Sequence, residues 1–221
     1  MLAAMGRRFV SERRRDRYYL AAQREGLRSR AAFKLAYLDD RFRLFRPGGR
    51  VLDLGAAPGG WALIARDRVG SHGRVTAVDL RPIEPIEGVE VVRGRVGDPR
   101  LSERLGTKPF DVVLSDLSPR IGGAYATDHA RSVALVRVAF EVARAHLRPG
   151  GTFVAKVFAG DMLDDLARDV AASFDDVRRT KPPASREPSS ELYLVARGYR
   201  PRREGPGPKP SGSDGPGRPA I

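Results

Sequence analysis

Short apolar segments alternate with longer amphipathic segments through the middle of the chain. The apolar segments are rich in β-branched residues and are bounded by Gly, Pro or Asp, which predicts strands. The predicted strands are Val51–Leu54, Arg74–Leu80, Val89–Arg93, Phe110–Leu117, Thr152–Phe158, Val177–Lys181 and Leu192–Arg197. The longer segments have helical periodicity. The predicted helices are Ser29–Phe42, Gly60–Val69, Arg131–Leu147 and Met162–Ser173.

Several of these strands are almost entirely apolar, as expected for strands that helices cover on both faces. Strands alternating with helices predict an α/β fold with a doubly wound, mostly parallel sheet. Folds of this class bind ligands beyond the carboxyl ends of their strands. Functional residues are therefore sought at those ends.

The chain divides into three parts by composition. Residues 28–199 contain the alternating pattern and predict one domain. Residues 1–27 form a basic extension, and residues 200–221 form a basic tail that we expect to be disordered. Proline and glycine fill 11 of the last 21 positions, so the tail cannot build a core.

The net charge of +13 is concentrated at the ends of the chain. Residues 1–30 hold nine arginines and a net charge of +6, and residues 200–221 add a net charge of +3. A polyanionic partner explains this distribution, because cationic side chains that contact phosphates release counterions. An arginine-rich but merely solvated surface is the alternative that charge alone leaves open.

Other classes of protein fit the composition poorly. The chain has no cysteine, which excludes disulfides and thiolate metal sites and fits a reducing cytoplasm. Its three histidines have no metal-ligand spacing, so we expect no metal. No apolar run suits a secretory signal or a membrane span, and nothing in the sequence demands more than a monomer.

A glycine-rich turn follows the first predicted strand, in the run Asp53-Leu54-Gly55-Ala56-Ala57-Pro58-Gly59-Gly60-Trp61. It lacks the G-x-G-x-x-G spacing of a pyrophosphate-binding turn, which favours S-adenosylmethionine over NAD. Asp79 ends the second strand, at the position where a carboxylate accepts hydrogen bonds from ribose hydroxyls. Because NAD sites also use such a carboxylate, Asp79 supports a nucleoside ligand without choosing between the two.

Lysine is scarce, with five lysines against 35 arginines. A position that has lysine instead of arginine therefore suggests a need for a property that arginine lacks. Arginine stays protonated in proteins, whereas a partly buried lysine can lose its proton. Lys156 lies inside an apolar strand, and Lys34 lies in an apolar helical segment. Asp116 lies at the end of one predicted strand, and Glu191 opens the last strand. If these elements converge, the four side chains form a Lys/Asp/Lys/Glu cluster. Snorkelling lysines and capping acids explain any one of them equally well.

Six ordered blocks between Arg13 and Gly198 resemble the FtsJ/RrmJ family of RNA ribose 2′-O-methyltransferases. The blocks are RSRAAFKL from Arg28, DLGAAPGGW from Asp53, LSDLSP from Leu114, FVAKVF from Phe153, KPPASR from Lys181 and SSELY from Ser189. The chain most resembles the bacterial members that methylate a uridine of 23S rRNA in the large ribosomal subunit. The resemblance implies a seven-stranded, Rossmann-like class I methyltransferase sheet with an antiparallel last strand. It also implies S-adenosylmethionine as the cofactor.

Carried over by motif, the family's K-D-K-E catalytic tetrad falls on Lys34, Asp116, Lys156 and Glu191. We expect Lys156 to accept the proton of the 2′-hydroxyl. The family's cofactor contacts fall on Gly59, Trp61, Asp79 and Asp116.

One position departs from the family pattern. After the third strand the family has an acid that faces the adenine, where this chain has Arg95. Asp98, three residues later, can substitute if the connection bends inward. The departure bears on cofactor affinity rather than on the type of reaction.

Five arginines ahead of the domain are candidate RNA contacts: Arg13, Arg14, Arg15, Arg28 and Arg30. The expected partner is large-subunit ribosomal RNA or the 50S subunit. The alternatives are methylation of tRNA or another RNA, a non-catalytic ribosome-assembly factor that binds RNA, and an NAD-dependent oxidoreductase. The sequence does not identify the methylated nucleotide, or decide between free rRNA and the assembled subunit.

Overall fold

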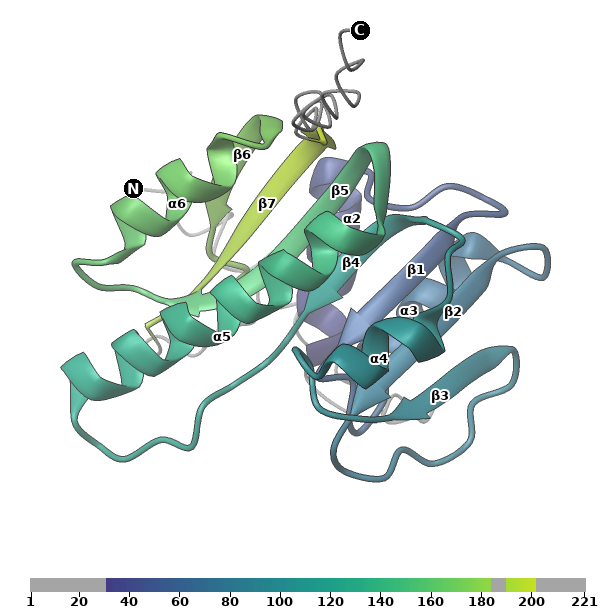
Figure 1. Ribbon diagram of the computed structural model, residues 1–221, viewed down its shortest axis with the longest axis horizontal. Helices are drawn as coiled ribbons and strands as arrows, with labels where there is room; N and C mark the ends of the chain where they lie inside the picture. The colour runs from purple at the N-terminus through teal and green to yellow at the C-terminus, as the bar shows by residue number, and fades with distance from the viewer. Residues whose placement is uncertain (1–30, 184–189, 202–221) are drawn as a thin grey trace, which may run out of the picture.

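The computed structural model describes residues 31–183 and 190–201, which form one seven-stranded sheet of order β3-β2-β1-β4-β5-β7-β6 with helices on both faces (Figure 1). The strands are β1 Arg50–Leu54, β2 Arg74–Asp79, β3 Val89–Arg93, β4 Phe110–Ser115, β5 Leu147–Phe158, β6 Phe174–Thr180 and β7 Glu191–Tyr199. The helices are α2 Ala31–Phe42, α3 Gly60–Val69, α4 Pro99–Leu105, α5 Tyr125–His146 and α6 Leu163–Ala171. The predicted basic extension, the five candidate RNA-binding arginines and residues 202–221 of the predicted tail lie outside the described residues.

Two apolar layers make the fold doubly wound, as predicted. Helices α4, α5 and α6 pack on one face, where Phe140 and Phe153 meet with ring centroids 5.8 Å apart. Helices α2 and α3 pack on the other face, over residues that include Leu114 and Val154. Burial of both faces explains why the central strands are apolar at successive positions.

Strand β7 runs antiparallel to both of its neighbours, β5 and β6, while β1 to β5 are mutually parallel. This confirms the antiparallel last strand that the family resemblance implied. In the register between β5 and β7, Phe158 pairs with Glu191. The first residue of β7 therefore lies at the carboxyl edge of the sheet, where β4 and β5 end.

All seven strands occur where they were predicted, with shifts at their ends. Helix α5 begins at Tyr125 rather than at Arg131, with Ala124 as an N-cap that makes no side-chain hydrogen bond. Asp128, in the first turn, instead accepts hydrogen bonds from the backbone of Gly122 and Gly123. A cap of this kind has no local sequence signature, which explains the missed turn.

Helix α4 was not predicted. It is seven residues long, too short for a clear apolar period. Its start nevertheless carries a readable signal, because Asp98 caps the helix and Pro99 occupies its first turn. No helix in the described part of the chain is long and apolar enough to cross a membrane.

Asp111 ties the amino edge of the sheet together. Its Oδ1 accepts from Arg46 at 2.8 Å and Arg148 at 2.5 Å, and its Oδ2 accepts from the backbone N–H of Arg50 at 2.7 Å. Burial raises the pKa of this carboxyl, but the three donors outweigh burial and hold the pKa below its ordinary value of 3.8. One side chain thus links the segment after α2 with β1, β4 and β5.

We expect Asp111→Asn to lower the free energy of unfolding by about 2 kcal/mol at pH 7, because charge-assisted hydrogen bonds are lost. A carboxyl whose pKa is depressed by folding stabilises the protein above its unfolded pKa, and this stabilisation is lost as pH falls through the folded pKa. The difference from wild type should therefore begin to shrink as pH falls below 3.8, and it should disappear only below the lowered pKa of the folded protein. Denaturant unfolding at several pH values measures it, and a difference independent of pH would contradict the assignment.

Candidate active site

The carboxyl edge of the sheet brings together the four residues of the predicted cluster. The Nζ atom of Lys156 lies 3.1 Å from Oδ1 of Asp116 and 4.0 Å from Oε1 of Glu191. The other oxygen of Glu191, Oε2, accepts a hydrogen bond of 2.5 Å from Nζ of Lys34. The four charges therefore alternate in sign along the series Lys34, Glu191, Lys156 and Asp116. The convergence that spacing alone could not establish is present in the structure.

The cluster is partly buried and its charges balance. The side chain of Lys156 is 7% exposed and that of Lys34 is 13% exposed, and both carboxylates remain about one-fifth exposed. Nζ of Lys156 also donates to the backbone carbonyl of Asp116 at 3.0 Å. That second contact fixes the direction of the amine while the site stays accessible from solvent.

Tyr193 lies at the centre of the cluster and was missed in the sequence. It is fully buried, and its hydroxyl donates to Oδ1 of Asp116 at 3.4 Å. Burial, followed by the negative charges of Asp116 and Glu191, raises the pKa of the phenol well above 10, so it stays a donor. The alternation of β7 was the available signal, because Glu191 and Tyr193 are two residues apart and share a face.

Trp61 connects the cluster to the glycine-rich turn. Its ring lies 5.8 Å from that of Tyr193, and its Nε1–H donates to the carbonyl of Ala31 at 2.8 Å. The indole therefore anchors the start of α2, which carries Lys34. Because the side chain is buried and its N–H is paired, the backbone N–H of Trp61 in the first turn of α3 is the group left for a ligand.

The glycine-rich turn between β1 and α3 brings backbone close to a ligand. Gly59 has φ +107°, and a Cβ there would lie 2.8 Å from Cδ1 of Ile86. Asp79 supports the turn, since its Oδ2 accepts from the N–H of Ala57 at 2.9 Å and its Oδ1 from the N–H of Arg81 at 2.8 Å. Carboxylate oxygens have further lone pairs, so Asp79 can still accept bonds from two ribose hydroxyls.

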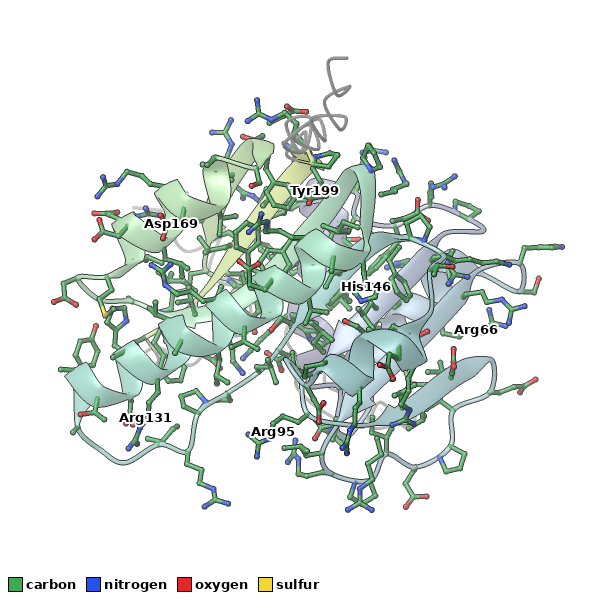
Figure 2. The ribbon with its side chains drawn as sticks, viewed as in Figure 1. Arg66, Arg95, Arg131, His146, Asp169 and Tyr199 are labelled. Carbon is green, nitrogen blue, oxygen red and sulfur yellow. The ribbon has the colours of Figure 1, made fainter. Side chains whose placement is uncertain are left out.

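The segment after β3 contains the position that departs from the family pattern. Arg95 is exposed and lies on the connection between β3 and α4 (Figure 2). Asp98 accepts a bond of 3.0 Å from the backbone N–H of Arg100 as the N-cap of α4. The structure therefore gives Asp98 a helix-capping role, which leaves Oδ2 and the remaining lone pair of Oδ1 for a contact with adenine.

Asp53, in β1 beneath the glycine-rich turn, is an unusual acid. It is fully buried, and neither carboxylate oxygen has a hydrogen-bond partner among the described residues. Burial raises its pKa well above 3.8, and the negative charges of Asp116 and Asp79 raise it further. The N–H of Ala62 acts the other way without reaching hydrogen-bond geometry. Burial and the neighbouring negative charges thus favour the neutral form of Asp53 next to the site.

The fold and the site define a class of protein. The structure is similar to the crystal structure of a ribosomal RNA methyltransferase from Plasmodium falciparum, with a TM-score of 0.71 and 27% identity over 79% of this chain and all of that one. It has the same fold as fibrillarin from Aeropyrum pernix, with a TM-score of 0.51 and 17% identity over 68% of this chain and 67% of that one. The chain has the Rossmann-like fold of methyltransferases.

Sequence comparison gives the family. Residues 27–199 match the model of the FtsJ-like methyltransferases. Proteins named Ribosomal RNA large subunit methyltransferase E are 48% identical in Halorubrum lacusprofundi, over 83% of this chain and 71% of that one, and 46% identical in Methanocaldococcus jannaschii, over 88% and 84%. The chain belongs to the FtsJ-like methyltransferase family.

Among residues 31–183 and 190–201, no cluster of three metal-ligating side chains occurs.

We expect Asp53→Asn to raise the melting temperature at neutral pH, because it removes an ionisable group from a site that disfavours charge. An acid whose pKa is raised by folding stabilises the protein most below its unfolded pKa, near 3.8, and this contribution is lost as pH rises toward the folded pKa. The advantage of the variant should therefore grow with pH. Melting temperatures between pH 4 and pH 8 measure it, and a constant offset would show that Asp53 does not titrate in this way.

Proposed function

We propose that this protein transfers a methyl group from S-adenosylmethionine to a ribose 2′-hydroxyl of RNA in the large ribosomal subunit. The observation that carries the proposal is the buried Lys156 amine, held between Asp116 and Glu191 at the edge where the glycine-rich turn lies. Family membership and relatives named for large-subunit ribosomal RNA support the reaction and the substrate. A uridine of 23S rRNA is the target that the resemblance favours.

The glycine-rich turn and Asp79 fit S-adenosylmethionine. Gly59 is required in this turn because its φ is +107° and Ile86 leaves no room for a side chain, and the turn presents backbone N–H groups at the start of α3. Asp79 would hold the ribose hydroxyls, Asp116 would lie toward the methionine part, and Asp98 with Arg95 would flank the adenine. When bound, the cofactor supplies a methyl group on a positively charged sulfur, which leaves as a neutral thioether.

Lys156 would be the proton acceptor. As the 2′-oxygen bonds to the methyl carbon and the carbon–sulfur bond breaks, Nζ of Lys156 would accept the hydroxyl proton. Asp116 orients that amine from one side, through its carboxylate and its carbonyl. Lys34 restrains Glu191 through a 2.5 Å hydrogen bond, so that Glu191 orients the amine from the other side. Alignment of the hydroxyl with the methyl group is the remaining task.

The basic extension, residues 1–27, together with Arg28 and Arg30, would hold the RNA across the mouth of the site. Replacing Arg13, Arg14 and Arg15 by alanine should weaken RNA binding and make it less dependent on salt. The variant makes fewer phosphate contacts, so fewer counterions are released when it binds. Filter binding over a salt series measures the slope. An unchanged slope would place the RNA surface elsewhere.

We expect Lys156→Ala to lose most of its turnover while S-adenosylmethionine still binds. A missing general base costs roughly 10²–10⁴-fold in rate. Lys156→Arg should fail as well, because arginine keeps the charge but cannot accept the proton. The assay supplies cofactor with a labelled methyl group and 50S subunits from cells that lack this enzyme, with free rRNA and tRNA in parallel.

The label should appear in large-subunit RNA as an alkali-resistant 2′-O-methyl nucleotide. Label in tRNA alone would support 2′-O-methyl transfer but reject large-subunit rRNA as the substrate. RNA binding without label transfer would reject the reaction and favour a non-catalytic assembly factor. The first variant to test would then be Arg95→Asp, which restores the acid expected from the family pattern. Normal turnover by Lys156→Ala, with cofactor binding confirmed by calorimetry, would reject Lys156 as the base.

A further inference from the structure

A basic groove lies away from the cluster, between the end of α2 and strands β6 and β7. Its volume is about 570 Å³, and it is lined by Arg41, Phe42, Arg178, Arg179 and Arg197. In Figure 1, β7 and β6 form the end of the sheet opposite β3, and α2 lies behind the neighbouring strands β4 and β5. We call this set of five residues the arginine groove. Nothing in the mechanism above uses it.

The arginine groove carries an excess of positive charge. Asp176 pairs with Arg197 at 2.6 Å and with Arg178 at 2.7 Å, and Asp164 pairs with Arg179 at 2.5 Å. Arg179 therefore points to the α6 face. On the α2 face, the single carboxylate of Asp176 meets two of three guanidinium groups, those of Arg178 and Arg197 but not that of Arg41. The hydrogen bond from Arg197 holds the pKa of Asp176 below its ordinary value. Exposed ion pairs of this kind add little to stability, so the surplus of arginine has no sufficient structural cause.

An aromatic ring lies among these cations. The guanidinium carbons of Arg41 and Arg197 are 5.5 Å and 5.8 Å from the ring centroid of Phe42. Arg41 otherwise makes a single long hydrogen bond, 3.3 Å, to the hydroxyl of Tyr37. Guanidinium groups bind phosphates in a forked geometry, and a ring beside them offers a surface for a base. This combination suits a nucleic acid strand better than an acidic protein surface.

The arginine groove and the catalytic cluster lie on the same face of the sheet. Helix α2 carries Lys34 near its start and Arg41 at its end, roughly 10 Å further along its axis. Strand β7 carries Glu191 at its first residue and Arg197 six positions on, roughly 20 Å away. Lys181, which is exposed, follows β6 at the edge where the cluster lies. A strand of RNA leaving the site can therefore reach the groove within a few nucleotides.

We infer that the arginine groove binds the phosphodiester backbone of the substrate RNA beside the methylated nucleotide. The inference rests on the proposed function, because it assumes that RNA enters the site. The groove would orient the RNA along α2 and so determine which nucleotide reaches Lys156. This role differs from that of the basic extension, which belongs to another part of the chain.

The first test is the double variant Arg41→Ala with Arg178→Ala, chosen because Arg197 and Asp176 stay paired. We expect KM for a 23S rRNA transcript to rise roughly tenfold, with kcat within twofold, and the slope of log affinity against log salt to fall by about two. The matched control is Arg74→Ala with Lys108→Ala, which removes the same charge from exposed positions at the amino edge of the sheet. It should leave KM unchanged.

The outcomes separate this inference from the proposed function. Absence of methyl transfer by the wild-type protein would reject the proposed function itself. Transfer by the wild type, with equal KM in the groove variant and the control, would reject the groove alone. Melting temperatures of both double variants should match that of the wild type, so that a folding defect is not mistaken for lost binding.

A second test locates the RNA directly. Because the chain contains no cysteine, Arg178→Cys provides a unique attachment point for an iron chelate that cleaves nearby RNA by hydroxyl radicals. On 50S subunits we expect cleavage within a few nucleotides of the methylated ribose, and none from Lys108→Cys. A raised KM on subunits for the double variant without such cleavage would mean that the groove meets a ribosomal protein, which would overturn the assignment to RNA.

Discussion

The direction of β7 is the constraint on which the site depends. Parallel strands all bring their last residues to the same edge, so they can supply Asp116 and Lys156 there. Only an antiparallel strand can bring its first residue to that edge, as the pairing of Glu191 with Phe158 does. If β7 ran parallel, Glu191 would lie at the opposite edge and the lysine would keep one carboxylate instead of two. The topology of the last strand is therefore part of the chemistry.

Charge balance explains why the cluster can be partly buried. An unpaired ammonium group inside the sheet would be costly, but each lysine here contacts a carboxylate, and the four charges sum to zero. The groups come from α2, β5, β7 and the residue that follows β4, which are far apart in sequence. Tyr193 and Trp61 pack between them and couple the glycine-rich turn to Lys34. The cluster can therefore form only once α2, β4, β5 and β7 have packed together.

The sequence predicted the parts of this structure that local patterns encode. The apolar runs located the strands, and the glycines with Asp79 located the ligand turn. The four charged residues of the cluster were visible because each interrupts or ends an apolar segment. Tyr193 was not noticed, because an aromatic residue in a strand is ordinary until its neighbours are known.

Other features depended on contacts between distant residues. The start of α5 depends on Asp128 reaching back to a loop, and the capping role of Asp98 competes with the ligand role expected for it. The basic groove needed the fold as well, since Arg41 and Arg197 are brought to one ring, that of Phe42, only by the packing of α2 on the sheet. Charge counts could show that arginine was abundant but could not show where it gathers.

Two buried aspartates show how stability is divided across the sheet. Asp111, at the amino edge, has three donors and a lowered pKa, whereas Asp53, near the carboxyl edge of the adjacent strand, has a raised pKa and no hydrogen-bond partner in the part of the chain that the structure describes. A sequence selected for stability alone would pair both acids or remove them. The unsatisfied one lies directly below the glycine-rich turn and within the field of Asp116 and Asp79. A buried polar group without a hydrogen-bond partner indicates a functional site, because such a group lowers stability and is kept only where function requires it.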